Sequence, residues 1–175
     1  MAWTSYKPQV VHLRKLIRKY PHTTILTCSR VGAHVVNELM LKARYRFQPL
    51  VTLDADVESN PENYTHGRLK KKLSPSKLKI YRGMRVYLTR NVRKEVDFVN
   101  GMLATVLGFN RKTKELRVET STKYTISIYP WTDTDLGNMV YYPVRGGYAS
   151  TILKFQGAEL SHVTLFLDRP KVFQQ

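Results

Sequence analysis

The sequence predicts an α/β chain in which a small antiparallel β-barrel interrupts an open parallel sheet. Apolar residues recur with a helical period near the amino terminus and then alternate with period two between residues 85 and 129. A continuous apolar run, with β-branched residues, follows at residues 163–167 and is typical of a strand in a parallel sheet. We therefore predict an open-sheet lobe at residues 1–75 and 131–175, and a small barrel of the SH3 or OB kind at residues 76–130.

Two helices and a strand are predicted in the first 45 residues. A helical stripe of apolar side chains runs from Pro8, at the first helical position, to Pro21, which ends the helix. Residues 23–27 are typical of a buried strand, and Ser29 can cap a second helix. The order helix, strand, helix favours the α/β class.

The junction between that strand and the second helix carries Arg30. Backbone amides at a helix amino terminus, together with a cation, form a usual site for an anion. Residues 27–32 can equally be a structural turn, and the sequence leaves both interpretations open.

Residues 142–168 are predicted to form a loop, a short helix and a buried strand. Ser150 can cap the helix, and Gly157 can end it. The strand at residues 163–167 is expected to be covered on both faces. Asp168 would follow it at the carboxyl edge of the sheet, where open α/β sheets bind ligands.

The predicted barrel rests on four short strands with alternating polarity, at residues 85–89, 102–109, 115–119 and 125–129. Glycine and asparagine residues mark the turns between them. Barrels of this kind often bind single strands along one face. Four tyrosines offer stacking surfaces there or pack into the barrel: Tyr81, Tyr87, Tyr124 and Tyr129.

Positive charge is the strongest compositional signal. The 175 residues contain 29 Lys and Arg against 13 Asp and Glu, a formal net charge of +16. Such an excess favours a polyanionic partner, above all nucleic acid. Residues 66–94 hold eleven of the cations and no acid. This block, with Lys70, Lys71 and Lys72, is either a disordered linker or a basic rim that follows a phosphate backbone.

Several other functions are disfavoured by the sequence. Cys28 is the single cysteine, and the five histidines lack the spacing of metal ligands, so no metal site is expected. Asp54 and Asp56 have no evident third ligand. No Gly-Lys pair and hence no P-loop occurs, and no nucleophile has an activating base. The chain lacks a run long enough to span a membrane and an apolar signal peptide, which predicts an intracellular protein.

Four segments in order resemble the second half of a RecD/Pif-type superfamily 1 DNA helicase: residues 25–37, 83–91, 99–106 and 148–157. In that family the first segment is the fourth helicase motif and the last is the fifth. The middle two belong to a barrel inserted into the second RecA-like domain. The resemblance therefore implies a RecA-like lobe with an inserted barrel.

The resemblance also implies roles for single residues. Thr151 matches a hydroxyl placed on the backbone of the tracked strand, and Lys154 lies where a basic residue is usual. Gln156 and Gly157 match the end of the motif that faces the nucleotide cleft. Arg30 and Leu153 replace an asparagine and a histidine that are usual in the family. The predicted sites are thus Thr151, Lys154, Lys70, Lys71, Lys72 and Arg85 for nucleic acid, and Gln156, Gly157 and Arg30 for the nucleotide.

The predicted function is that of the nucleic-acid-binding carboxyl-terminal lobe of an ATP-dependent, 5′-to-3′ DNA helicase. ATP and magnesium would be needed only by a complete helicase, because this chain carries no P-loop. The expected partners are single-stranded DNA and an amino-terminal RecA-like domain that this chain lacks. The alternative is a basic module that binds single strands or a protein partner without helicase activity.

Overall fold

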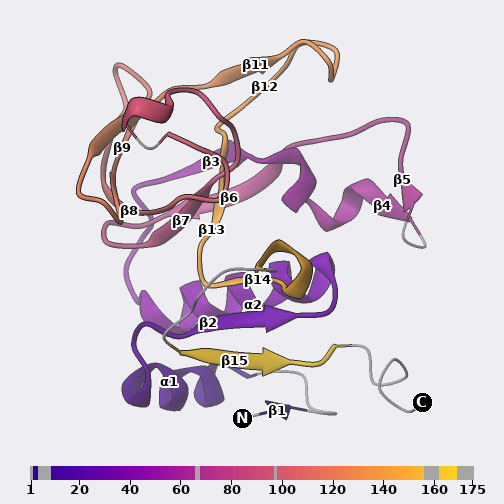
Figure 1. Cartoon of the computed structure of the whole chain (residues 1–175), viewed down its shortest axis with the longest axis vertical. Coiled ribbons are helices and arrows are strands. Elements are labelled where there is room, and N and C mark those ends of the chain that lie inside the picture. The colour runs from indigo at the N-terminus through magenta and orange to yellow at the C-terminus, as the bar shows by residue number, and fades with distance from the viewer. Residues whose placement is uncertain (1, 4–8, 66–67, 97, 156–161, 169–175) are drawn as a thin grey trace. The chain divides into compact units, whose positions relative to one another are not determined.

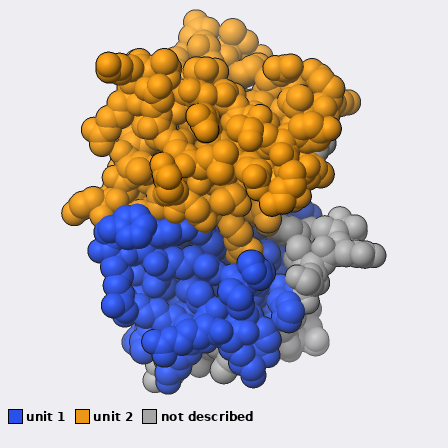
Figure 2. All heavy atoms as spheres, turned by 90° about the vertical axis from the view of Figure 1, so that its left-hand side faces the viewer, with its two compact units in different colours: residues 1–47, 148–175 blue, residues 48–147 orange. Residues whose placement is uncertain are grey.

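The computed structural model describes residues 2–3, 9–65, 68–96, 98–155 and 162–168. The described chain is mixed α/β, with one parallel sheet and several antiparallel ones (Figure 1). It divides into two compact units, residues 1–47 with 148–175 and residues 48–147, which are coloured separately in Figure 2. In this division, residues 48–75 and 131–147 belong to the same unit as residues 76–130, the segment predicted to form the barrel. The predicted domain assignment itself stays a prediction.

The first unit is built on a parallel sheet. Its strand order is β1-β15-β2-β14, and every neighbouring pair is parallel. The strands are β1 (Ala2–Trp3), β15 (Val163–Phe166), β2 (Thr24–Thr27) and β14 (Ala149–Thr151). Strand β2 is therefore paired on both sides, as expected for a buried strand of an open parallel sheet.

Two helices accompany this sheet. They are α1 (Val10–Lys19) and α2 (Arg30–Arg44), and the helices pack on each other while α2 also contacts β14 and β2. The apolar side chains that these elements bury include Leu13, Ile25, Val36 and Met40. Both helices were predicted, and Ser29 caps α2 as expected, its hydroxyl accepting a hydrogen bond from the Gly32 amide.

Two details of residues 142–168 differ from the prediction. Ser150 lies buried within β14, paired with Leu26, so it does not cap a helix. Parallel pairing with β2 occupies the backbone there, and the described residues that follow directly form the short 3₁₀ turn η4 (Ile152–Phe155). Strand β15 buries Thr164 and Phe166 but exposes the intervening side chains, since successive residues point to opposite faces. In the described part of the chain it is covered on one face.

The second unit contains a five-stranded antiparallel sheet with the order β10-β9-β8-β7-β13. The strands are β7 (Arg85–Leu88), β8 (Leu103–Asn110), β9 (Glu115–Thr120), β10 (Thr125–Ile128) and β13 (Val144–Gly146). All four predicted strands are present. The backbone φ of Gly83 is 78° and that of Gly101 is 88°, values that favour glycine and explain the turns.

Three two-stranded antiparallel pairs and three short 3₁₀ turns are also described in this unit. The antiparallel pairs are β3 (Val51–Ala55) with β6 (Ser76–Ile80), and the hairpins β4 (Tyr64–Thr65) with β5 (Arg68–Leu69) and β11 (Trp131–Asp133) with β12 (Met139–Tyr141). The turns are η1 (Val57–Ser59), η2 (Pro61–Asn63) and η3 (Lys94–Val96). Residues 68–94 thus contain β5, β6 and β7, so a disordered linker is the wrong interpretation of the basic block.

Candidate nucleic-acid interface

Lys70, Lys71 and Lys72 lie on a loop of the second unit that leaves η2 and returns to β6. The loop spans residues 63–74, and its β4–β5 hairpin forms the tip of an arm in Figure 1. Arg68 and the three lysines are exposed. No acid occurs between residues 63 and 74, and no ion pair among the described residues involves these four cations.

Asn63 closes this loop at its base. Its amide nitrogen donates to the carbonyl oxygens of Val57 and Ser74, each at 2.8 Å. Its side-chain oxygen accepts from the Ser74 amide at 2.9 Å. Asn63 is 1% exposed, so these bonds replace water on a buried polar group. Residues 63 and 74 are therefore held together, which makes the segment a closed Ω-type loop.

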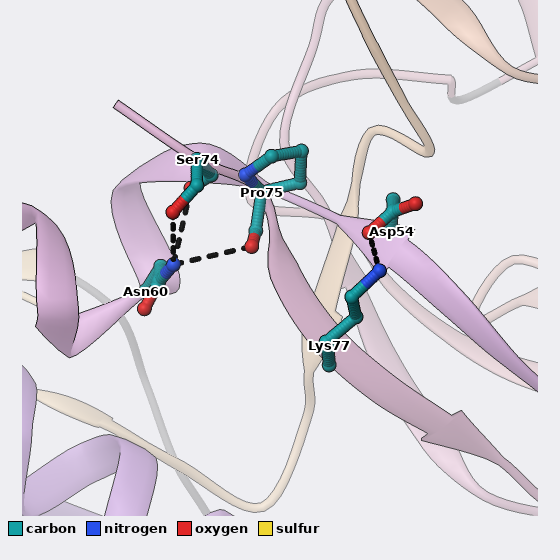
Figure 3. Close-up of polar contacts among 5 residues, drawn as sticks. All are labelled: Asp54, Asn60, Ser74, Pro75 and Lys77. Atoms are coloured by element: carbon teal, nitrogen blue, oxygen red, sulfur yellow. Dashed lines mark hydrogen bonds and ion pairs between the residues drawn. The ribbon is translucent and has the colours of Figure 1, made fainter. Parts of the chain in front are cut away.

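Asn60 adds a second set of contacts at the same base. Its amide nitrogen faces Ser74 and Pro75 in Figure 3 and donates to both carbonyl oxygens at 3.1 Å. Its side-chain oxygen accepts from the Glu62 amide and caps η2. We call Asn60, Asn63 and Ser74 the asparagine clasp. The clasp fixes the two ends of the basic loop while its cations remain in solvent.

Two aspartates of the same unit, Asp54 and Asp56, lie on either side of the end of β3 and are held in different ways. Lys77 forms an ion pair with Asp54 at 2.5 Å, also visible in Figure 3. Asp56 is buried and accepts a hydrogen bond from the Ser59 hydroxyl at 2.8 Å. Burial raises the pKa of Asp56, an effect that its hydrogen bond to Ser59 opposes. No group of three potential metal ligands occurs among the described residues.

In the first unit, Thr151 ends β14 and is half-buried, while Lys154 is exposed on η4. Leu153 between them has an exposed fraction of 83%. Gln156 and Gly157 lie outside the described residues. In the second unit, Arg85 begins β7 and is partly buried. The structure thus gathers the three lysines on one loop, and places Thr151 beside Lys154 on another segment.

Asn37 holds the strand that carries Thr151. Its side-chain oxygen accepts from the amides of Tyr148 and Ala149 at 3.0 and 2.9 Å, and its nitrogen donates to the Ala149 carbonyl at 2.9 Å. These bonds fix the start of β14 from helix α2. Sequence reasoning assigned no role to Asn37, Asn60 or Asn63, because the partners of an asparagine amide depend on tertiary contacts.

The amino terminus of α2 is occupied by Asp168. The Cys28 and Ser29 amides donate to one carboxylate oxygen at 2.8 and 3.2 Å, and the Ser29 hydroxyl donates to the other. A side chain at Gly32 would collide with this carboxylate. Asp168 therefore meets the positive end of the helix dipole. The arrangement favours the structural turn at residues 27–32, and Arg30 is exposed beside it.

The comparisons with known proteins concern this fold. No protein-family model matches the chain, and no curated protein matches its sequence. Solved structures of Pif1 helicases do match. A Bacteroides Pif1 bound to ssDNA is 17% identical with a TM-score of 0.54, over 93% of this chain and 43% of that chain. Pif1 helicase from Candida albicans is 19% identical with a TM-score of 0.55, over 85% of this chain and 39% of that chain.

A second Bacteroides structure, in complex with ADP-AlF3 and ssDNA, is 17% identical with a TM-score of 0.55. It matches over 93% of this chain and 44% of that chain. This chain thus spans less than half the length of the helicases it resembles. The likeness confirms the resemblance to Pif-type superfamily 1 helicases at the level of the fold. No helix among the described residues is long and apolar enough to cross a membrane.

Proposed function

We propose that this chain binds single-stranded DNA as the carboxyl-terminal lobe of an ATP-dependent helicase. The observation that carries this proposal is the closed basic loop at residues 63–74. It presents four exposed cations and no acid on a base fixed by buried hydrogen bonds. A loop whose two ends are already fixed loses less backbone entropy when its cations meet phosphates.

The fold likeness gives this loop its context. Two of the Pif1 structures contain ssDNA, and one also contains ADP-AlF3. By analogy, the five-stranded antiparallel sheet of residues 85–146 would be the inserted barrel, and the parallel sheet would belong to the second RecA-like domain. In this assignment Lys70, Lys71, Lys72 and Arg85 contact strand phosphates, as do Thr151 and Lys154.

The nucleotide part of the proposal concerns a complete helicase. Gln156, Gly157 and Arg30 would face ATP and magnesium only with an amino-terminal RecA-like domain across the cleft. This chain alone is expected to bind a strand without hydrolysing ATP, since its sequence has no P-loop. The 5′-to-3′ direction and an intracellular location are what the sequence resemblance to a DNA helicase implies.

Fluorescence anisotropy tests the binding step. The chain should bind a fluorescein-labelled oligothymidylate, and its affinity should fall steeply as the salt concentration rises, because each phosphate contact releases counterions. A strand-binding surface with several contacts gives a slope of about −0.7 per contact in log K against log salt. Absence of binding at low salt, or binding that salt does not change, would refute the proposed function.

A further inference from the structure

A second set of exposed cations lies on the turn between β8 and β9, at residues 111–114. Arg111, Lys112 and Lys114 are exposed, and none of the ion pairs among the described residues includes them. The turn is held in place from three sides. Arg111 donates to the Leu50 carbonyl at 2.9 Å, and the Asn110 side chain accepts from the Lys112 amide at 3.0 Å. The Tyr142 hydroxyl donates to the Lys114 carbonyl at 2.7 Å.

Two exposed aromatic side chains leave the sheet at the same end. Ile128 of β10 pairs with Leu116 of β9, so β10 ends at the level where β9 begins, directly after the turn. Tyr129 follows β10 and is 51% exposed. Trp131, two residues further on, is 39% exposed.

The backbone that carries Trp131 is well anchored. Trp131 pairs with Tyr141 across the β11–β12 hairpin, which Figure 1 shows reaching beyond the five-stranded sheet. The Tyr141 hydroxyl donates to the buried Asp133 carboxylate at 2.7 Å, and Arg90 contacts both groups. This buried network ties the hairpin to the chain segment after β7. The indole is therefore exposed on a fixed strand.

We infer that Tyr129 and Trp131 form a base-stacking platform for a single strand, with phosphates contacted by Arg111, Lys112 and Lys114. The two rings belong to residues only two positions apart in the chain, so bases of one strand can reach both. Aromatic rings interleaved with cations are the usual composition of a surface that binds single strands without sequence preference. The nearby Glu115 carboxylate accepts a hydrogen bond from the Ser127 hydroxyl, and the buried Asp133 carboxylate forms an ion pair with Arg90.

This inference rests on the proposed function and adds a second contact region to it. Tyr81 and Tyr87 do not contribute, because they are 8% and 4% exposed. Tyr124 is 49% exposed but lies at the opposite end of β10, before its first residue. It therefore provides a matched control with nearly the same exposure.

The tryptophan count makes the test direct. Trp3 and Trp131 are the two tryptophans, so the variant Trp3→Phe leaves Trp131 as the single reporter. Oligothymidylate should quench its emission and protect it from acrylamide, because a stacked base covers the indole. An oligonucleotide of abasic residues, with the same phosphates, should bind weakly and leave the emission unchanged.

Substitutions complete the experiment. Tyr129→Ala and Trp131→Ala should each weaken oligothymidylate binding by about tenfold, the usual order of a lost base–aromatic stack. Tyr124→Ala should leave the affinity unchanged, and Trp131→Phe should retain most of it. Circular dichroism of each variant checks that the strands persist.

The outcomes separate this inference from the proposed function. If the oligonucleotide binds by anisotropy but neither quenches Trp131 nor responds to the two alanine variants, the platform is refuted while strand binding stands. A surface used by a protein partner would give that result. If the oligonucleotide does not bind at all, both the platform and the proposed function fail.

Discussion

The closed basic loop of residues 63–74 and the segment from β14 to η4 were both predicted to meet the phosphate backbone, yet they are built differently. The loop has many cations and its two ends are joined by the asparagine clasp. The second segment has one exposed cation, Lys154, and is fixed by Asn37 only at the start of β14. Electrostatic affinity follows the number of cations that meet phosphates, so the loop should dominate strand binding.

The largest effect on stability is expected from Asn63→Ala. The change removes three good hydrogen bonds made by a buried side chain, and the Ser74 amide loses its Asn63 partner. At about 1 kcal/mol for each bond, the free energy of unfolding should fall by about 3 kcal/mol. Urea denaturation followed by circular dichroism measures this difference.

Strand affinity should also fall in Asn63→Ala, although no charge is lost. Freeing the ends of the loop gives the backbone that carries Lys70, Lys71 and Lys72 more freedom, which we expect to weaken binding about tenfold. The measurement is anisotropy at a temperature where the variant is folded. If affinity is unchanged, the clasp is purely structural and the ordering of the loop does not matter for binding.

Asn37→Ala makes the corresponding change in the other segment. It removes three bonds to Tyr148 and Ala149 in a partly buried site, so water can replace some of them. We expect a loss of about 2 kcal/mol in the free energy of unfolding, with little change in strand affinity. Parallel urea and anisotropy measurements check both values. An affinity loss as large as that of Asn63→Ala would remove the difference between the two regions.

Leu153→His tests whether a polar side chain at residue 153 strengthens strand binding by the segment from β14 to η4. Leu153 is 83% exposed, so an imidazole can be accepted without repacking. One added hydrogen bond to a strand phosphate would raise the affinity about threefold to tenfold. Leu153→Gln is a neutral polar control that separates hydrogen bonding from the partial charge of histidine. No gain with either side chain would count against the strand-binding role assigned to residues 151–154.

The smallest effect concerns Asp56 beside the loop. Burial raises the pKa of Asp56 in the folded chain, so the ionised carboxylate destabilises the fold. The protonated carboxyl group avoids this cost at low pH. The stability of the fold therefore falls as the pH rises through the folded-state pKa of Asp56. Asp56→Asn should therefore raise the melting temperature by a few degrees at pH 7, with the gain shrinking toward pH 4. Asp54→Asn, which loses an exposed ion pair with Lys77, should give no gain at any pH. A gain that is independent of pH would contradict the assignment.

The sequence predicted the regular elements well because their signals are local. The alternation in residues 102–109 and the cap at Ser29 require only neighbouring residues, and both are present as β8 and α2. Ser150 was assigned wrongly because a hydroxyl that can cap a helix also fits a buried parallel strand. Pairing with β2, whose partner residues lie 124 positions away in sequence, decided the outcome.

The candidate site was less predictable for the same physical reason. The lysines of the basic loop were evident from composition, but the clasp that closes the loop depends on amide groups meeting across eleven residues. Asp168 was expected at the carboxyl edge of the sheet. Its contact with the amino terminus of α2 was not predictable, because Cys28 and Ser29 lie 140 and 139 residues away from it in sequence. The platform of Tyr129 and Trp131 became visible only with the exposure of each ring.

The most direct test of the central claim compares two triple variants of equal charge. Lys70→Ala, Lys71→Ala and Lys72→Ala together remove the cations of the closed loop. Lys42→Ala, Lys79→Ala and Lys123→Ala remove three exposed cations scattered over α2, β6 and the turn before β10. The loop variant should lose up to about 100-fold in oligothymidylate affinity at 0.1 M salt, and its salt slope should shrink by about 2. The scattered variant should stay near the parent chain, and equal losses in the two variants would contradict a localised strand-binding loop.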